Sequence, residues 1–331
     1  MKGKKRRINF RRIGKRITYA LFVFLFVLTA LEISYRYQWI DFFKSEFKAL
    51  NTEVKEGRSN VLLFGDSFTA HPNGYVELLR SRNTNYNFIN TAIPGTGPIE
   101  MSLLAEGRVN EYSPELVIYQ MYIGNDLLDI TPIKNWGQLS FSRNLYWSSK
   151  SWFQIFGLLS RRWNGAQTDF DITYNSQEDI PFSIGTFSPR TKMLIKADPE
   201  FVEKSITDSE YFEDARDECV ERIQYLEELL PDGTTLYVVV LPHFSQVNEE
   251  YQRRFVELGA SETTQTTQYP FINYMEENLP GIHVVNPLEF IRLREANGCQ
   301  MYYENDPHFS GDGQAAFATF LEQEILMSEH E

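Results

Sequence analysis

Residues 60–67 read Asn-Val-Leu-Leu-Phe-Gly-Asp-Ser, an apolar run that passes through a glycine into a polar turn. A short apolar run bounded by turn residues is typical of a strand buried on both faces of a sheet. Four more runs rich in β-branched and aromatic residues follow, and longer segments with helical periodicity separate them. Strands are therefore predicted at 60–64, 86–90, 116–122, 234–241 and 281–285. Helices are predicted at 75–82, 98–110, 209–230, 246–258, 265–278 and 310–326.

This alternation of buried strands with helices predicts the fold class. Strands that are apolar on both faces belong to parallel sheets whose two faces are covered by helices. We therefore expect an α/β protein built as a three-layer α/β/α sandwich. In such sheets the working residues gather in loops beyond the carboxyl ends of the strands, so catalytic groups are sought in those loops.

Charge is distributed unevenly along the 331 residues. Residues 1–16 hold nine Lys or Arg and no acid, whereas the rest of the chain holds 23 basic and 45 acidic residues, a net charge of -22. The total of -13 argues against a nucleic-acid partner, because neutralising phosphates requires a basic surface. Two pieces of such different charge are expected to face different environments.

An apolar segment follows the basic tail. Residues 17–31 are uncharged, and the aromatic residues Tyr37 and Trp39 lie just beyond, where membrane interfaces favour them. The positive-inside rule places the basic tail in the cytoplasm and the acidic body in the periplasm or exterior, which predicts a single-pass protein of the inner (cytoplasmic) membrane. A cleavable signal peptide is the alternative, although no small-x-small cleavage pattern follows Leu28.

The expected organisation has four parts and one irregular stretch. The parts are a basic tail at 1–16, a transmembrane signal anchor at 17–35, a linker at 36–58 and a globular domain at 59–328. At about 131–206 no clear strand–helix alternation is visible, and a connection this long is usually a lid, a binding loop or a small subdomain. Its aromatic rings form either a hydrophobic cluster of their own or a surface that faces a substrate. The insertion holds four of the five tryptophans, Trp136, Trp147, Trp152 and Trp163.

Candidate catalytic side chains follow the predicted strands. Ser67 comes directly after the first strand, where its hydroxyl can lie next to backbone N–H groups. His308 lies shortly before the last helix, and Asp306 can hold its imidazole so that the other nitrogen faces Ser67. Gly95 follows the second strand and permits a backbone N–H to approach a ligand closely. Asn125 follows the third strand, and its amide can donate a hydrogen bond to an oxyanion.

Other reactive residue types give weaker signals. Cys219 and Cys299 lie in the part expected outside the cytoplasm, where a disulfide is permitted, and two unrelated thiols are the alternative. Their spacing is unlike a zinc site, and the sequence contains no phosphate-cradling glycine loop, so neither a metal nor another cofactor is expected. His71 is the one rival base, four residues after Ser67, but no acid stands beside it.

Taken in order, these residues resemble the sequence blocks of the SGNH/GDSL hydrolase superfamily. Two features depart from the commonest pattern: Gly124 and Asn125 are adjacent, and Asp306 precedes His308 by two residues instead of three. The second feature resembles the branch that includes bacterial exopolysaccharide O-acetylation proteins. The corresponding blocks are Gly65-Asp66-Ser67, Gly95, Gly124-Asn125-Asp126 and Asp306-Pro307-His308.

The resemblance implies a parallel, flavodoxin-like sheet and a serine mechanism. Ser67 would be the nucleophile, His308 the base and Asp306 the acid that orients it. The backbone N–H groups of Ser67 and Gly95, with the side chain of Asn125, would form the oxyanion hole. No cofactor is implied.

The expected function is a membrane-anchored serine esterase that acts on ester groups, chiefly O-acetyl, of a carbohydrate or small ester. An O-acyltransferase that modifies an envelope or exopolysaccharide is one alternative, and a non-catalytic glycan-binding or assembly protein is another. A phospholipase is disfavoured by the net charge of -22 unless a basic patch exists, for which Arg161 and Arg162 beside Trp163 are the only hint. Expected partners are the membrane, through 17–35, an acylated glycan and polysaccharide-synthesis proteins of the membrane.

Overall fold

A parallel sheet forms the centre of this computed structural model, which describes residues 10–130, 141–163, 180–207, 210, 212–263 and 267–327. Within those residues the sheet has five strands in the order β2-β1-β3-β4-β5, and every neighbouring pair is parallel. This order is that of flavodoxin-like sheets, so the predicted fold class is confirmed. The strands are β1 (Ser59–Phe64), β2 (Tyr86–Asn90), β3 (Leu116–Tyr122), β4 (Thr235–Leu241) and β5 (His283–Val285).

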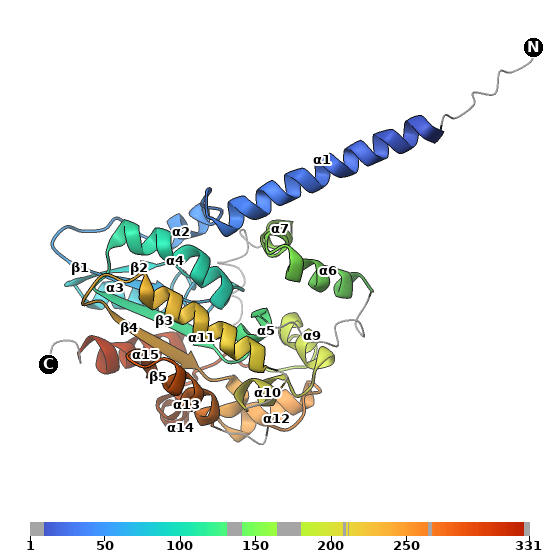
Figure 1. The fold of residues 1–331 in the computed structure, drawn as a ribbon. Helices are drawn as coiled ribbons and strands as arrows, with labels where there is room; N and C mark the ends of the chain where they lie inside the picture. Colours follow the sequence, from blue (N-terminus) through green and yellow to red (C-terminus); the bar gives the residue numbers. More distant parts are fainter. Residues whose placement is uncertain are drawn as a thin grey trace, which may run out of the picture.

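Helices cover both faces of this sheet (Figure 1). They include α3 (Tyr75–Arg82), α4 (Pro98–Tyr112), α11 (Glu213–Glu228), α13 (Tyr269–Asn278), α14 (Leu288–Ala296) and α15 (Gly311–Leu321). The chain reverses its direction across the sheet after β2, so right-handed crossovers place α3 and α4 on opposite faces. Helix α11 packs against α4, and α15 packs against α3. The sheet is thereby enclosed, which explains why its central strands are apolar on both faces.

The helix predicted at 246–258 begins later than expected. A 3-10 turn, η2 (Phe244–Gln246), comes first, and α12 (Glu249–Glu257) follows. The Asn248 side chain accepts the Tyr251 backbone N–H at 2.8 Å, which satisfies a free donor of the first helical turn. This cap sets the start of α12.

Other boundaries differ for similar local reasons. The helix predicted at 310–326 leaves α-helical geometry after Leu321 and ends in a π-helical turn, η3 (Glu322–Leu326). The helix predicted at 209–230 begins only at Glu213. Two short helices, α14 and α5 (Asp126–Ile130), were not predicted, because so few turns leave little periodic pattern to detect.

The insertion expected at 131–206 contains helices, although its sequence shows no clear rhythm. Short helices separated by irregular chain hide the periodic apolar pattern on which prediction depends. Trp136 lies outside the described residues, Trp147 and Trp163 lie within helices, and the side chain of Trp152 is 78% exposed. The helices are α6 (Phe141–Trp152), α7 (Ile155–Trp163), α9 (Pro189–Ala197) and α10 (Phe201–Ile206).

Helix α1 (Phe10–Arg36) projects from the body, and only its C-terminal end packs against it (Figure 1). The stretch Gly14–Arg36 has a mean hydropathy of 2.1 and is long enough to cross a membrane, properties that a signal sequence shares. Near its end Tyr35 is buried against Phe43, just before α2 (Lys44–Leu50). The end of α1 is therefore part of the folded body.

Both cysteines are free thiols. Cys219 is buried in α11 next to the Met121 sulfur, whereas Cys299 is partly exposed after α14. The disulfide that an oxidising compartment would permit is not formed.

Candidate active site

Three of the predicted residues form a hydrogen-bonded chain at the carboxyl end of the sheet. The Ser67 Oγ lies 2.7 Å from His308 Nε2, although 241 positions separate the two residues. The other ring nitrogen of His308, Nδ1, bonds the Asp306 carboxylate. Asp306 also accepts the His308 backbone N–H at 3.0 Å, so one turn holds both residues. A spacing of two residues therefore suffices for the acid to orient the imidazole.

Backbone hydrogen bonds hold the turn that carries Asp306 and His308. An antiparallel bridge joins Tyr302 to Phe309, and the Tyr303 backbone N–H donates to the His308 carbonyl at 3.0 Å. The Phe68 ring, next to Ser67 in the chain, lies 4.9 Å from the imidazole. The His308 imidazole is thus held through the backbone hydrogen bonds of its turn and by contact with the Phe68 ring.

The start of α15 also helps to hold this turn. Ser310 caps the helix by accepting the Gly313 backbone N–H at 3.0 Å. A Cβ atom at Gly313 would lie only 2.0 Å from the Met301 carbonyl oxygen, so no other residue fits without a backbone shift. The glycine therefore permits the close approach that positions His308 opposite Ser67.

His308 has a raised pKa. Burial opposes the charged imidazolium, but the charge and hydrogen bond of Asp306, together with the charge of Asp66, outweigh burial and raise the pKa of His308 above the ordinary value of 6.5. A raised pKa makes the ring a better proton acceptor, as a general base requires. The side chain is 24% exposed, so the base is reachable from solvent.

Asn125 lies in the same small cavity as Ser67 and His308. Its Nδ2 lies 3.4 Å from Asp66 Oδ2, and Asp66 Oδ1 accepts the Phe68 backbone N–H at 3.0 Å. Asp66 thus links the amide to the turn that carries the serine. An amide nitrogen carries two hydrogens, so the contact with Asp66 uses one of the two donors of a side chain that lines the cavity.

Gly95 adopts a left-handed conformation, with φ at 66°, which favours glycine over other residues. The turn that carries it is tied to the first strand, because the Ile93 backbone N–H donates to the Gly65 carbonyl at 3.2 Å. Among the described residues Gly95 does not line the cavity itself. It lies beside Arg190, which does: a Cβ atom at Gly95 would be 3.1 Å from Arg190 Nη1.

Two buried carboxyl groups lie under the site. Burial raises the pKa of Asp66, and the backbone N–H of Phe68 partly offsets the rise. Burial raises the pKa of Asp126 still further, and the neighbouring Asp66 charge adds to it. Asp126 Oδ2 accepts the Tyr122 backbone N–H at 2.9 Å, so Asp126 shapes the loop that presents Asn125.

Several lining residues escaped the sequence analysis. Helices α9 and α10 contribute Arg190, Thr191, Leu194 and Phe201 to the cavity. Arg190 Nη2 lies 3.6 Å from Asp129 Oδ1, which holds the guanidinium near the site. The Ser-Pro pair before Arg190 marks a helix start, but nothing in the sequence indicates that this helix returns to the sheet edge.

His243 was also missed as a lining residue. Its Nδ1 accepts the Ser245 backbone N–H at 3.3 Å and lies 2.8 Å from Ser245 Oγ. Burial lowers the pKa of His243 to about 3, so the ring is neutral. The rival base His71 accepts the Asn73 backbone N–H at 3.2 Å, and the described cavity around Ser67 does not include it.

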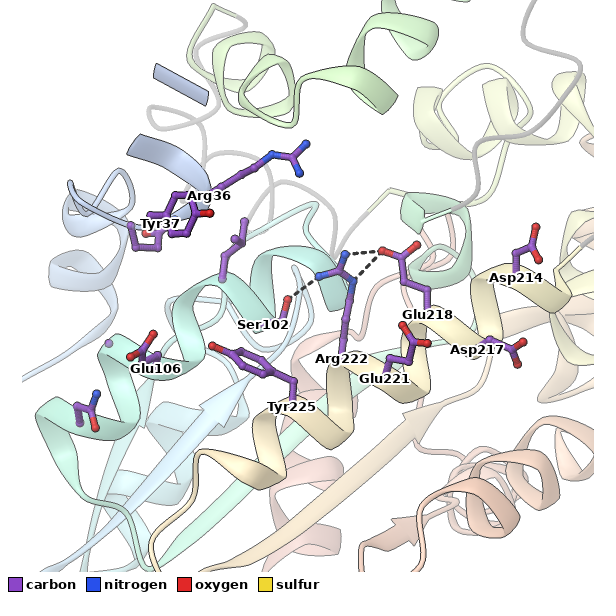
Figure 2. Close-up of a pocket in the computed structure, with 14 residues that line it drawn as sticks. Arg36, Tyr37, Ser102, Glu106, Asp214, Asp217, Glu218, Glu221, Arg222 and Tyr225 are labelled. Carbon is purple, nitrogen blue, oxygen red and sulfur yellow. Dashed lines mark hydrogen bonds and ion pairs between the residues drawn. The ribbon is translucent and has the colours of Figure 1, made fainter. Parts of the chain in front are cut away.

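A larger groove lies away from this chemistry. It has a volume of about 1000 Å³ and runs between α4 and α11 beside the end of α1 (Figure 2). Arg222 crosses it, donating to Ser102 Oγ at 2.8 Å and pairing with Glu218. None of the three residues of the hydrogen-bonded chain lines it. Within the described part of the chain, no group of His, Cys, Asp or Glu is placed to hold a metal ion.

Comparison with known proteins finds solved structures whose backbones are similar to that of this chain. No protein-family model matches the sequence, and no curated protein matches it. A structure of a lipolytic G-D-S-L family member from Veillonella parvula is 12% identical, with 81% of this chain and 98% of that chain covered and a TM-score of 0.41. A variant of the acetylxylan esterase Axe2 from Geobacillus stearothermophilus is 13% identical, with 82% and 96% covered and a TM-score of 0.42. A lipase from a goat rumen metagenome is 13% identical, with 80% and 96% covered and a TM-score of 0.40.

Proposed function

We propose that this chain is a serine esterase of the SGNH/GDSL kind. One observation carries the proposal: Ser67 Oγ lies 2.7 Å from His308 Nε2, while Asp306 bonds the other nitrogen of the same ring. A nucleophile, a base and an orienting acid in that order are the parts needed for acyl transfer. A purely structural role would not require this hydrogen-bonded series of Ser67, His308 and Asp306 to lie at the edge of a cavity.

The reaction follows from these positions. Ser67 Oγ attacks the ester carbonyl carbon while His308 Nε2 takes the hydroxyl proton, and Asp306 stabilises the imidazolium. The negative charge that develops on the carbonyl oxygen is met by the Asn125 amide, with backbone N–H groups of Ser67 and Gly95 as the further proposed donors. The oxyanion collapses, the alcohol leaves with the proton from His308, and water then releases the acyl group by the same steps.

The size of the cavity favours a short acyl group. Its volume is about 50 Å³, whereas one water molecule needs about 10–15 Å³ on such a scale, so only a few non-hydrogen atoms fit beside Ser67. An acetyl group fits within this volume, whereas a long fatty-acyl chain would have to extend out of the cavity. We therefore propose O-acetyl esters, carried by a carbohydrate or a small alcohol, as the substrates.

We further propose that α1 anchors the chain in the inner membrane, with the tail 1–16 in the cytoplasm and the body outside. The apolar stretch Gly14–Arg36 supports this proposal, together with the nine basic residues within residues 1–16. Transfer of the acetyl group to a glycan hydroxyl uses the same acyl-enzyme, and it differs only in the group that accepts the acyl.

The test is ester hydrolysis by the full chain in detergent. Acetyl p-nitrophenyl ester should be cleaved, butyryl ester more slowly and octanoyl ester hardly at all. Ser67→Ala should abolish turnover, whereas Ser81→Ala, an exposed serine on α3, should leave it unchanged. Equal turnover by Ser67→Ala and the wild type would show that the nucleophile is wrong. Product analysis with acetylated glycan and then with free glycan acceptor separates hydrolysis from transfer.

A further inference from the structure

Helices α6 and α7 form a basic segment of a body that is acidic overall. Residues 141–163 contain four basic residues and no acid, although the chain after residue 16 has a net charge of -22. Such a segment is attracted to anionic lipid headgroups, which repel the remainder of the body. The basic residues are Arg143, Lys150, Arg161 and Arg162.

The same segment exposes large apolar side chains. Phe141 is 82% exposed, Leu145 is 59% exposed and Trp152 is 78% exposed. Leu145 and Trp152 lie four and eleven residues after Phe141, so at 3.6 residues per turn all three side chains fall on one side of α6. We call these three residues the α6 stripe. An exposed aromatic stripe on a basic helix is the composition of helices that lie in a membrane interface.

The α6 stripe is fastened to the end of α1. The Glu32 carboxylate accepts the backbone N–H groups of Gln154 at 3.0 Å and Ile155 at 2.9 Å, where α7 begins. Glu32 is itself buried and pairs with Arg36, the last residue of α1, at 2.6 Å. This junction holds α6 and α7 at the point where the apolar stretch of α1 ends. Figure 1 shows both helices on the side of the body from which α1 projects.

Exposed aromatic residues also follow the end of α1 in the chain. Tyr37 is 72% exposed and Trp39 is 71% exposed, and their rings stack 6.3 Å apart. Tyr and Trp are common at the headgroup level of a bilayer, where one end of the ring is apolar and the other is hydrated. Exposed aromatic residues therefore lie on two segments that meet at the end of α1.

We propose that the α6 stripe, with Tyr37 and Trp39, is a membrane-docking surface that lies in the headgroup layer of an anionic bilayer. The proposal rests on the anchoring of α1 and adds that the body lies against the bilayer instead of being tethered at a distance. Charge complementarity favours a lipid surface over a protein occupant, because this segment carries basic residues and no acidic ones. Docking fixes the orientation of α9 and α10, and with them the Ser67 cavity, relative to the membrane.

Spin labels on the full chain in phosphatidylglycerol-containing vesicles test the proposal. Cys299→Ser serves as the background, since Cys219 is buried and does not react. Labels are placed by Leu145→Cys and Trp152→Cys in the stripe. The matched control is Leu293→Cys, which is 62% exposed on α14, at the opposite end of the body from α1 (Figure 1).

A fourth label, Phe26→Cys in α1, reports the anchor itself. The ratio of oxygen accessibility to accessibility to a water-soluble nickel chelate should be several-fold higher at 145 and 152 than at 293, and highest at 26. High salt should lower the ratio at 145 and 152 and leave 26 unchanged, because salt screens headgroup attraction.

Three results would overturn the proposal. A ratio at 145 and 152 equal to that at 293, with 26 still in lipid, refutes docking and leaves the anchor intact. A ratio at 26 equal to that at 293 refutes the anchor, and docking with it. Labels at 145 and 152 that are shielded from both reagents assign the α6 stripe to a protein interface.

Discussion

Asn125 is a single buried side chain to which the proposed mechanism assigns an oxyanion contact. Its Nδ2 lies 3.4 Å from Asp66, and its Oδ1 has no partner within the described part of the chain. The amide is therefore oriented from one side and open on the other. Replacing it removes a fixed donor from the point where negative charge develops.

Asn125→Ala should lower kcat for acetyl ester hydrolysis by about 100- to 1,000-fold, the usual loss for one oxyanion donor. Some turnover should remain, because Ser67 and His308 stay in place. Asn110→Ala, an exposed asparagine on α4, is the matched control. An unchanged kcat for Asn125→Ala would remove this residue from the oxyanion hole.

The pH dependence of hydrolysis reports His308. The base must be neutral to accept the serine proton, and its pKa is raised, so the acid limb of kcat/KM should lie above pH 6.5. Asp306→Asn removes the carboxylate that raises the pKa and leaves burial, which lowers it. The limb should therefore move to lower pH even as the rate falls. A limb that stays in place would show that Asp306 does not control the base.

Asp126 makes stability depend on pH. Its folded pKa is raised above the ordinary 3.8, so the folded state keeps a proton that the unfolded state has released, and the free energy of unfolding falls as pH rises through that interval. Asp126→Asn should reduce this fall and stabilise the protein near pH 7, because the variant has no proton to lose there. Thermal unfolding from about pH 4 to 7 measures it. Parallel pH curves for both proteins would contradict the assignment.

At the scale of elements, the start of α15 positions the catalytic turn. A Cβ atom at Gly313 would meet the Met301 carbonyl oxygen at 2.0 Å. Gly313→Ala should therefore shift the turn, lower stability by about 1–3 kcal/mol as other overpacked sites do, and reduce hydrolysis. Gly107→Ala on α4, where a Cβ atom has no neighbour within 4 Å, should lose neither stability nor activity. Equal thermal midpoints for the two variants would contradict this account of α15.

The same scale separates what the sequence could predict from what it could not. The run before Ser67 is apolar on both faces, so its strand and the polar turn beyond it followed from local pattern alone. His308 could be singled out because Asp306 stands beside it in the chain. Arg190 and His243 could not, because each reaches the cavity only through the packing of α9, α10 and the end of β4. Short helices such as α14 gave too little periodicity to be recognised.

At the scale of the whole molecule, charge is distributed unevenly along the chain, which supports the proposal that its parts have different surroundings. The nine basic residues within residues 1–16 and the net charge of -22 beyond them favour opposite sides of a membrane. Helices α6 and α7 carry basic residues and no acidic ones within a body that is acidic overall, and Glu32 ties them to the end of α1. Under the proposed anchoring and docking, the small cavity beside Ser67 has a fixed orientation to the bilayer.

The central claim, that Ser67 is an activated nucleophile, is tested most directly by a fluorophosphonate reagent on the folded full chain. Peptide mapping should find one adduct, on Ser67, because the neighbouring His308 makes this hydroxyl reactive. The adduct should be absent in Ser67→Ala, far slower to form in His308→Gln and unchanged in Ser81→Ala. No adduct on Ser67 in the folded wild-type protein would contradict the account.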